Sequence, residues 1–499
     1  MRLIVSSDIH GCIMPNRYSD EKIMNMGILK LMATMRNYKN ENTIVIDNGD
    51  TFTGSPMTTY FRTTGYKDDP TTYYLNSIVD YYNVGNHDFD YGVEYLQNYM
   101  GSFMGKSLCG NVFFHGERLA NDYCIANIEN RKVAIIGCVT KGFLDWERKE
   151  NVEHVEALDA FEFVKDIIEK LRRKEKPDLI VVCYHGGFEN DFEGNRISQD
   201  DGIDQAYRMC KELDFDIMVS GHQHISLAGK CFGKLACQTK NNGQEFAVID
   251  YDFEDRNGFV RLVRSDEEVS KDDLWVYENL EEETQKWLDI PLGRIDGDSL
   301  LVKDEYEARI NKHPIISFIN QVQKETTGSM LSSCSLFNEA TGFDEEITMR
   351  DIVSTYVFEN NLVVMEINGK TLREYLEKTA EYFTIKDGKI AVSDEFLYPT
   401  PKGFDYDMVD GIDYTIKVSN PRGKRIVELK YQGNDVNDDD VFTITINNYR
   451  AGGGGDYYMF KDCKRIKEIQ DNMVTVLSNY FIEKKAVTVR HRKNIEVII

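Results

Sequence analysis

The chain has 499 residues, of which 41% are hydrophobic and 29% are charged, and its formal net charge is −25. This length exceeds one ordinary core, so we expect two globular domains. The negative charge repels polyanions and so disfavours long nucleic acids as partners. Small anionic substrates would need a local positive field, which bound divalent cations can supply. No apolar run approaches the ~20 residues of a membrane span, so we expect no membrane segment.

The chain opens with MRLIVSS, which alternates directly into a short apolar strand. No basic segment, apolar segment or small-residue cleavage site precedes the first motif, so we expect a cytoplasmic protein. The ten cysteines have no CxxC pair and no framework spacing. Such usage is typical of reduced thiols and fits the same compartment.

Short β-branched runs alternate with amphipathic stretches from residue 2 to about residue 264. The runs cover residues 43–47, 133–138, 179–184 and 216–220, and the helix-like stretches cover residues 21–36 and 160–173. This rhythm is typical of α/β layers with buried strands. We therefore expect an N-terminal domain over residues 1–270, built as a sandwich of two mixed sheets flanked by helices.

An acidic, helix-prone segment over residues 266–290 ends at Pro291. We interpret residues 271–300 as a linker helix followed by a turn. The remaining chain, residues 301–499, mixes helices with strands, which predicts an α+β domain. The helices are expected at 314–323 and 369–382, and the strands at 362–367, 414–418, 426–431 and 442–447.

Four consecutive glycines, residues 452–455, separate a predicted strand from Tyr457 and Tyr458. Glycine permits backbone conformations and close approaches that other residues do not. Two interpretations are equally good: a loop that approaches a ligand, or a flexible turn.

Ligand-type residues directly follow five predicted strands of the first half. In chain order they read D-x-H (residues 8–10), G-D (49–50), G-N-H-D (85–88), a single histidine (185) and G-H-Q-H (221–224). In an α/β sandwich, loops at the carboxyl ends of neighbouring strands converge on one crevice. Residues far apart in sequence can therefore share one site, and the adjacent glycines let the backbone turn tightly.

Two divalent ions ~3.5 to 4 Å apart need a bridging carboxylate, and Asp50 is the natural bridge. The other ligands would be Asp8, His10 and His224 for one ion, and Asn86, His185 and His222 for the other. Any one of these histidines could be a structural residue at a strand end, but five clusters in this order favour a metal site. The mixed nitrogen and oxygen ligands favour manganese, iron or zinc over calcium.

In their order DxHG, GD, GNHD, H and GHxH, these motifs resemble the calcineurin-like metallophosphoesterases. The segment GNHDFD is similar to the GNHEFD of the nucleotidase branch. By that resemblance, His87 would steady the phosphoryl oxygens and the leaving group in the transition state, and Asp90 would orient the imidazole. Asp90 could instead simply cap a helix.

The second half is similar to the C-terminal domain of 5′-nucleotidases and 2′,3′-cyclic-nucleotide 2′-phosphodiesterases, in residues 348–371, 372–383 and 447–456. The resemblance therefore covers nearly the whole chain. It implies that two aromatic rings sandwich a nucleobase: Tyr449 matches one, and Tyr406 best fits the other, with Phe404 on the same strand face as the alternative. Asp456 would contact the base, although an extra glycine precedes it. Either tyrosine could also be an ordinary core residue.

One departure from the family pattern distinguishes the branches. 5′-Nucleotidases have an N-G-G-G-I-R stretch whose arginine and asparagine reach the phosphate, whereas residues 333–338 read SCSLFN here. This loss, with NNYRA around Tyr449, resembles the cyclic-phosphodiesterase/3′-nucleotidase branch. We therefore expect dimetal-dependent hydrolysis of nucleotide phosphoesters. The alternatives are a 5′-nucleotidase or UDP-sugar hydrolase and, more distantly, a non-catalytic nucleotide-binding protein.

Overall fold

The computed structural model describes residues 1–499 except residues 20–21, 66–67, 199–201, 358–359 and 399. Its contacts divide the chain into two compact units, Met1–Thr284 and Gln285–Ile499. Both units combine sheets with helices, so the predicted fold class is confirmed. None of the helices in these described residues is long and apolar enough to cross a membrane.

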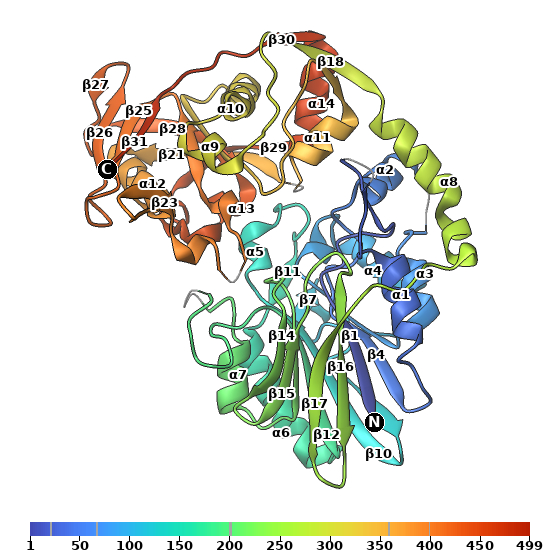
Figure 1. The fold of residues 1–499 in the computed structure, drawn as a ribbon. Helices are drawn as coiled ribbons and strands as arrows, with labels where there is room; N and C mark the ends of the chain where they lie inside the picture. The colour runs from blue at the N-terminus through green and yellow to red at the C-terminus, as the bar shows by residue number, and fades with distance from the viewer. Residues whose placement is uncertain (20–21, 66–67, 199–201, 358–359, 399) are drawn as a thin grey trace. The chain divides into compact units, whose positions relative to one another are not determined.

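The first unit is built on two six-stranded sheets (Figure 1). The first has the order β17-β16-β1-β4-β5-β6 and consists of β1 Arg2–Ser6, β4 Thr43–Asp47, β5 Tyr81–Asn83, β6 Lys106–Leu108, β16 Glu245–Asp252 and β17 Asn257–Arg264. The second has the order β14-β15-β13-β12-β10-β9 and consists of β9 Tyr123–Ile128, β10 Arg131–Val139, β12 Leu179–His185, β13 Ile217–Ser220, β14 Leu227–Cys231 and β15 Lys234–Gln238. Parallel and antiparallel pairs occur in both, as expected for mixed sheets.

The two sheets share one apolar core. Val5 and Ile46 of the first sheet and Val181 and Val219 of the second belong to it, and each is at most 1% exposed. The other face of the second sheet packs on helix α6 (Ala160–Lys174) and helix α7 (Ala206–Glu212). Strands covered on both faces explain the unbroken β-branched runs in the sequence.

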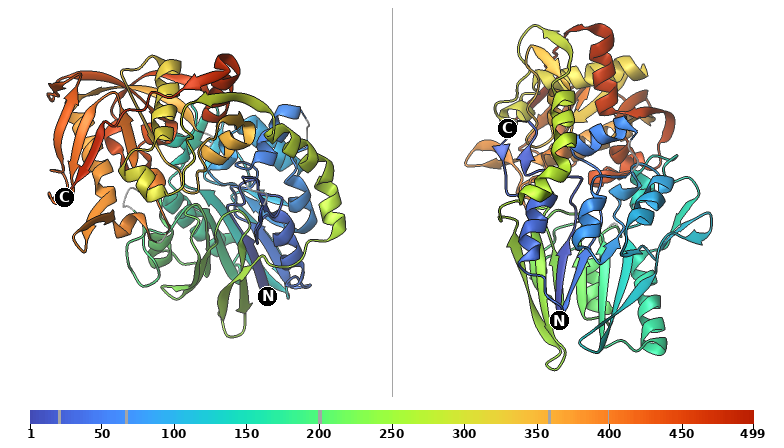
Figure 2. Two further views of the ribbon diagram at one scale, coloured as in Figure 1. Left: turned by 45° about the horizontal axis from the view of Figure 1, so that its top comes forward. Right: turned by 90° about the vertical axis from the view of Figure 1, so that its right-hand side faces the viewer.

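Strands β1, β4 and β5 run parallel, and so do β10, β12 and β13. In Figure 1 the carboxyl ends of β1 and β4 lie away from the N-terminus, and Figure 2 shows the same unit from two other sides. The carboxyl ends of these strands and the loops that follow them contain all the predicted metal ligands. The sandwich therefore places the loops of both sheets where one site can form.

The helix predicted over residues 21–36 begins later than expected. Helix α1 spans Ile28–Arg36, and residues 16–17 and 22–23 form the short hairpin of β2 (Asn16–Arg17) and β3 (Lys22–Ile23) instead. Residue 21 lies outside the described residues. Gly27 is the N-cap of α1, and glycine is needed there because φ is 88° and an added Cβ would lie 2.6 Å from the Met14 carbonyl oxygen.

Helix α8 (Lys271–Leu288) is the predicted acidic helix, and β18 (Pro291–Asp296) follows it. The expected turn at Pro291 is thus a strand, which pairs with β20 (Glu346–Thr348) and β30 (Ala486–Thr488) in the second unit. The residues after α8 fold as part of a sheet, since their backbone groups pair there.

The second unit has further sheets of five and four strands. The five-stranded sheet has the order β24-β19-β28-β21-β29, with β19 Leu331–Ser335, β21 Asn361–Asn368, β24 Asp407–Asp410, β28 Val441–Asn447 and β29 Lys464–Asn472. The four-stranded sheet has the order β27-β26-β25-β31, with β25 Asp413–Lys417, β26 Ile426–Tyr431, β27 Asn434–Asp435 and β31 Ile495–Ile498. One core joins them to helices α10 Pro314–Thr327, α12 Gly369–Thr379 and α14 Met473–Lys484.

Phe318 on α10 provides a test of this second core. Its ring is fully buried and contacts Phe343 and Phe481, with ring centroids 5.5 and 5.3 Å away. Phe318→Ala should lower the free energy of unfolding of the second unit by about 3 to 5 kcal/mol, because it leaves a cavity. Hydrogen exchange of peptides from residues 285–499 measures this locally. Tyr398→Ala, at a side chain 70% exposed, is the control and should change it by less than about 0.5 kcal/mol.

Candidate active site

The ends of five strands bring the seven predicted metal ligands together. Six ligands lie in the loops after β1 (Asp8, His10), β4 (Asp50), β5 (Asn86) and β13 (His222, His224), and His185 is the last residue of β12. Five of the seven have a left-handed backbone, with φ between 51° and 76°: Asp8, His10, Asp50, His222 and His224. Residues other than glycine seldom adopt this conformation, and such strain concentrates at functional sites.

The first group of ligand atoms comes from Asp8, His10 and His224, which lie within 4.8 Å of one another. His10 Nε2 and His224 Nε2 are 3.0 Å apart, and His224 Nε2 is 3.5 Å from Asp8 Oδ1. Burial and the neighbouring His224 lower the pKa of His10 to about 4. The His10 imidazole is therefore neutral at pH 7, as a metal ligand must be.

The second group consists of Asp8, Asp50 and His185, again within 4.8 Å. His185 Nε2 lies 3.1 Å from Asp50 Oδ2 and 3.7 Å from Asp8 Oδ1. Both Asp50 Oδ2 and His185 Nε2 are buried, and neither makes a well-directed hydrogen bond to any described residue. Since buried polar atoms normally have partners, these orphaned atoms fit a divalent cation. Asp8 belongs to both groups and Asp50 to the second, so the role of Asp50 as the carboxylate shared by both ions stays a prediction.

Asn86 and His222 lie together beside this group, with Asn86 Oδ1 2.9 Å from His222 Nδ1. The backbone N–H of His222 donates to Asp8 Oδ1 at 2.9 Å, which ties the β13 loop to the β1 loop. The His222 ring also stacks on Trp146 of helix α5 (Phe143–Trp146), with centroids 5.4 Å apart and planes at 5°. Trp146 escaped the sequence analysis because it belongs to no motif.

A second layer of contacts orients the ligands. His185 Nδ1 lies 2.5 Å from the Asn48 carbonyl oxygen, so Nδ1 donates and Nε2 is the nitrogen that would face a metal. The Asp88 carboxylate accepts the backbone N–H groups of Gly85, Asp50 and Thr51 at 2.7, 3.0 and 3.0 Å. It therefore locks the β4 loop to the β5 loop. The GNHD motif already contained this aspartate, but its sequence gave no sign of a role distinct from ligation.

Glycine is required where these two loops meet. Gly49 has φ 91°, and an added Cβ would lie 2.3 Å from the Gly85 nitrogen. A Cβ on Gly85 would lie 2.2 Å from Asp50 Oδ1. The predicted need for glycine beside the ligands is thus explained by close packing of one loop on the other.

His87 and Asp90 form the predicted pair. His87 Nδ1 lies 3.2 Å from both Asp90 carboxylate oxygens, and its backbone N–H donates to Asp50 Oδ1 at 2.7 Å. Burial acts to lower the pKa of His87, but the charges of Asp90 and Asp50 outweigh it and raise the pKa to about 10. The alternative that Asp90 caps a helix does not hold for α4 (Val93–Ser102), whose N-cap is Gly92 without a side-chain cap bond.

Two further residues lie behind Asp90. Asn151 Nδ2 donates to the Asp90 carbonyl oxygen at 2.7 Å and to Glu147 Oε1 at 3.0 Å. Burial and the nearby Asp90 carboxylate raise the pKa of Glu147 to about 8. The uncharged form of Glu147 is therefore favoured near neutral pH, which spares Asp90 a second buried negative charge. Neither residue stands in a recognisable motif, so sequence analysis had no signal for them.

In the second unit, the choice of Tyr406 as a stacking residue is wrong. Its ring is 0% exposed and stacks on Tyr382, with centroids 4.8 Å apart and planes at 21°. Residues 403–405 form a 3₁₀ turn, so positions 404 and 406 do not share a strand face as we expected. The alternative, Phe404, is only partly buried and is the better candidate.

Tyr449 lies on helix α13 (Asn448–Ala451) and is partly buried. Asp456 is also partly buried, and its two carboxylate oxygens accept from Lys378 Nζ at 3.4 Å and from the Tyr458 hydroxyl at 3.0 Å. Contact of either residue with a base stays a prediction.

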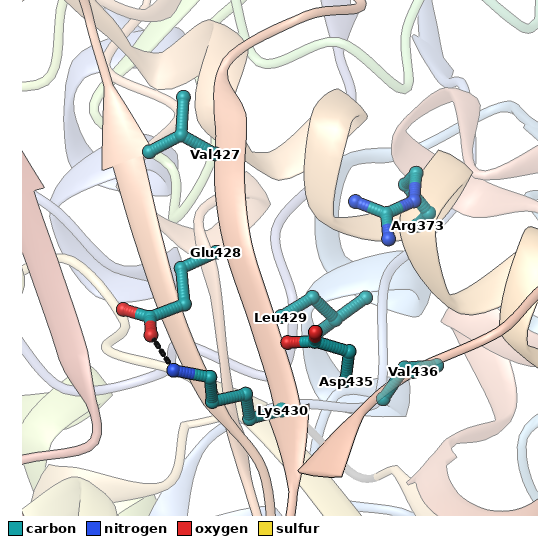
Figure 3. Close-up of a pocket in the computed structure, with 7 residues that line it drawn as sticks. All are labelled: Arg373, Val427, Glu428, Leu429, Lys430, Asp435 and Val436. Atoms are coloured by element: carbon teal, nitrogen blue, oxygen red, sulfur yellow. Dashed lines mark hydrogen bonds and ion pairs between the residues drawn. The ribbon is translucent and has the colours of Figure 1, made fainter.

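A surface hollow of about 540 Å³ lies elsewhere in the second unit, along β26 and helix α12 (Figure 3). Its lining includes Arg373, Leu429 and Asp435, and Glu428 forms an ion pair with Lys430 at its edge. None of its lining residues is a predicted site residue. The hollow is therefore not the active site, which is defined by ligand geometry instead.

The fold and the paired ligand groups together define a metal-dependent phosphoesterase with a second, α+β domain. Residues 1–226 match the calcineurin-like phosphoesterase family, and residues 291–462 match the 5′-nucleotidase C-terminal domain. A Staphylococcus aureus protein with the provisional name 5′-nucleotidase has a crystal structure with a TM-score of 0.92 to this chain and is 30% identical, covering 100% of this chain and 99% of that one. The chain belongs to the calcineurin-like phosphoesterases with a 5′-nucleotidase C-terminal domain, and it is a hydrolase of phosphoric esters.

Two curated relatives extend the comparison. The 2′,3′-cyclic-nucleotide 2′-phosphodiesterase/3′-nucleotidase of Salmonella typhimurium is 24% identical, over 91% of this chain and 81% of its own length. The trifunctional nucleotide phosphoesterase protein YfkN of Bacillus subtilis is 23% identical over 99% of this chain, which spans only 38% of that relative's length. Calcineurin-like phosphoesterases use a dimetal centre, and the orphaned atoms of Asp50 and His185 fit one here.

Asp50→Ala should remove the carboxylate that we predict both ions share. We expect bound metal, measured by elemental analysis, to fall from two ions per chain to at most one. Turnover should fall by at least about 10³-fold, because the ions contribute several kcal/mol to the transition state. Asp69→Asn is a matched control: it is a buried aspartate of the same unit that accepts from Tyr95 and Thr71. Near-normal turnover of Asp50→Ala at saturating metal would refute the ligand assignment.

Asp90→Asn should shift the pH dependence of kcat/KM. His87 is protonated below its pKa, which the Asp90 charge raises, so the present chain should keep this proton well above neutral pH. Without that charge the pKa of His87 falls. The alkaline limb of the pH profile, where activity is lost as His87 loses its proton, should therefore move to lower pH. His87→Ala should cost about 10² to 10⁴ in rate. Glu94→Gln, at an exposed site on α4, should leave the pH profile unchanged. An equal shift of the profile in Asp90→Asn and Glu94→Gln would contradict the pairing of His87 with Asp90.

Proposed function

We propose that the chain hydrolyses nucleotide phosphoesters as a 2′,3′-cyclic-nucleotide 2′-phosphodiesterase/3′-nucleotidase. The observation that supports this choice is the missing phosphate-binding arginine in residues 333–338. The first of these residues belong to β19, where Ser333, Cys334 and Ser335 are all buried. Their polar groups face inward: the Cys334 thiol donates to the Ile316 carbonyl oxygen, and Ser333 Oγ lies 2.7 Å from the Tyr375 hydroxyl.

Arg309 does reach this stretch from helix α9 (Glu305–Ile310), but its guanidinium is already paired with groups of the protein. Its Nη2 donates to the Leu336 carbonyl oxygen at 3.0 Å and to Asn338 Oδ1 at 3.1 Å. Arg309 is 5% exposed and pairs with Glu305 at 2.8 Å. A terminal phosphate carries up to two negative charges, whereas a cyclic diester carries one and needs less cationic compensation. This difference supports the cyclic substrate.

The chemistry divides between the metals and the chain. A pair of divalent ions, when bound, activates water at neutral pH and offsets charge on the phosphoryl oxygens. His87, held by Asp90, is placed to hold a proton for the departing 2′-oxygen as the phosphorus to 2′-oxygen bond breaks. The product is a 3′-nucleotide, and the same residues would serve hydrolysis of its 3′-ester. The metal identity (manganese, iron or zinc) and the cytoplasmic location stay predictions.

A 5′-nucleotidase or UDP-sugar hydrolase is the second candidate. The provisional name of the Staphylococcus aureus protein, which is similar over the full chain, supports it. The curated relatives named for the cyclic activity come from three species, each matched over 91% of this chain. The names alone do not separate the two activities, so the local chemistry at residues 333–338 carries the choice.

A substrate panel on metal-reconstituted protein tests the proposal. We expect kcat/KM to be at least about tenfold higher on 2′,3′-cyclic AMP than on AMP, since one missing charged contact to phosphate is worth roughly that factor. Asp50→Ala, run in parallel, should abolish both rates and so assign them to the same site. A preference for AMP or for a UDP-sugar would make the second candidate correct, and absence of turnover with bound metal would favour a non-catalytic nucleotide-binding protein.

A further inference from the structure

A buried arginine lies at the centre of the region that contains the predicted base-stacking residues. Arg450, on α13, is 2% exposed. Its Nε donates to Asp407 Oδ2 at 2.7 Å, and its Nη2 donates to Asp407 Oδ1 and to the Phe404 carbonyl oxygen, both at 3.0 Å. Its Nη1 donates to the Gly454 carbonyl oxygen at 2.6 Å and to Asp405 Oδ1 at 3.3 Å.

These five contacts connect three pieces of chain. The first piece is residues 404–407, the second is the glycine stretch 452–455, and the third is α13 itself. Phe404 accepts directly from Arg450, and Tyr449 is its neighbour in sequence. The Arg450 guanidinium is therefore linked to Phe404 by a hydrogen bond and to Tyr449 by the adjoining backbone. Its planar donor geometry is rigid.

The surroundings of Arg450 are themselves fixed. The Tyr375 hydroxyl donates to Asp407 Oδ2 at 2.6 Å, and the Tyr457 hydroxyl donates to the Asp405 carbonyl oxygen at 2.7 Å. The guanidinium carbon lies 4.1 Å from the centre of the Tyr457 ring. Two carboxylates and a ring thus enclose one cation, which satisfies the buried charge from every side.

The glycine stretch is shaped by the same packing. An added Cβ on Gly454 would lie 2.4 Å from the Tyr449 ring, and one on Gly455 would lie 2.3 Å from Arg450 Nη1. Gly453 and Gly455 have φ of 91° and 67°. Of the two interpretations of residues 452–455, the flexible turn is therefore the poorer one: these glycines let the loop pack tightly on Arg450 and Tyr449.

We propose that Arg450 is a positioning residue for nucleobase binding, which holds Phe404 and Tyr449 in fixed places by tying their two segments together. The proposal rests on the proposed function, because it assumes a nucleotide substrate with a base that stacks on these rings. The Asp405 and Asp407 carboxylates offset the positive charge of Arg450, so Arg450 contributes position rather than a positive field for the substrate. Its effect should appear only with substrates that have a base.

Arg450→Lys tests this, because lysine keeps the charge but cannot reach three segments at once. The matched control is Arg425→Lys: Arg425 is 8% exposed in the same unit and donates to the Ala380 and Phe383 carbonyl oxygens, and it makes no hydrogen bond to the described residues of 404–407 or 449–457. The readout is the ratio of kcat/KM on 2′,3′-cyclic AMP to kcat/KM on bis-p-nitrophenyl phosphate, which has no base. We expect this ratio to fall at least about tenfold in Arg450→Lys, mainly through KM, and to stay within about twofold in Arg425→Lys.

A second variant covers the case in which Arg450→Lys does not fold. Tyr375→Phe removes only the hydroxyl that donates to Asp407, and it should lower the same ratio by about two- to fivefold. Equal ratios in Arg450→Lys and Arg425→Lys, or an unchanged ratio in Tyr375→Phe, would overturn the inference. A wild-type protein that turns over bis-p-nitrophenyl phosphate but no nucleotide would instead refute the proposed function, so the two failures are distinguishable.

Discussion

The candidate active site depends on how the two oxygens of Asp50 are used. Asp50 Oδ1 accepts the backbone N–H of His87, and the Asp50 backbone N–H donates to Asp88, so one half of the residue holds the β4 and β5 loops together. Asp50 Oδ2 is buried beside His185 Nε2 and makes no well-directed hydrogen bond to any described residue. An ionised carboxylate left in this way is costly unless a cation completes it. The Asp50 side chain therefore takes part both in the loop geometry and in the candidate metal site.

The same constraint explains how a chain with a net charge of −25 can act on an anion. Asp8 and Asp50 place two buried negative charges close together. A pair of divalent cations would more than balance them and would leave a local positive charge. His87 adds a proton beside them, since Asp90 and Asp50 raise its pKa. The positive field is thus confined to the place where the phosphoryl group reacts. The rest of the surface can stay acidic without repelling substrate from the centre, because salt screens it beyond about 8 to 10 Å.

Much of this arrangement could be predicted from the sequence. The strand predicted at residues 43–47 is β4, and those at 179–184 and 216–220 differ from β12 and β13 by one residue at one end. These strands are buried on both faces, so hydrophobic runs mark them unambiguously. The residues of both three-residue groups, such as His185 and His224, could be predicted to lie together because they combine residue type with a strand-terminal position. That combination is local, and local signals survive folding.

The residues that were chosen wrongly or missed differ from these, because the role of each depends on contacts between residues distant in sequence. Tyr406 and Phe404 look equivalent in sequence, and only the 3₁₀ turn at residues 403–405 sends one ring into the core. Glu147 and Asn151 approach Asp90 from another segment, without a motif. In the sequence, Arg450 stands out only as part of the motif NNYRA. Its structural role depends on hydrogen-bond partners 43 to 46 residues earlier in the chain.

These long-range contacts also separate two uses of buried charge in one protein. At Asp50 one carboxylate oxygen lies 3.1 Å from His185 Nε2 and makes no well-directed hydrogen bond to any described residue, so that site can take a ligand. At Arg450 every donor has a protein acceptor, so that site is closed and can only fix geometry. An unsatisfied buried group points to binding, whereas a satisfied one points to positioning. This distinction requires coordinates, because aspartate and arginine look equally charged in a sequence.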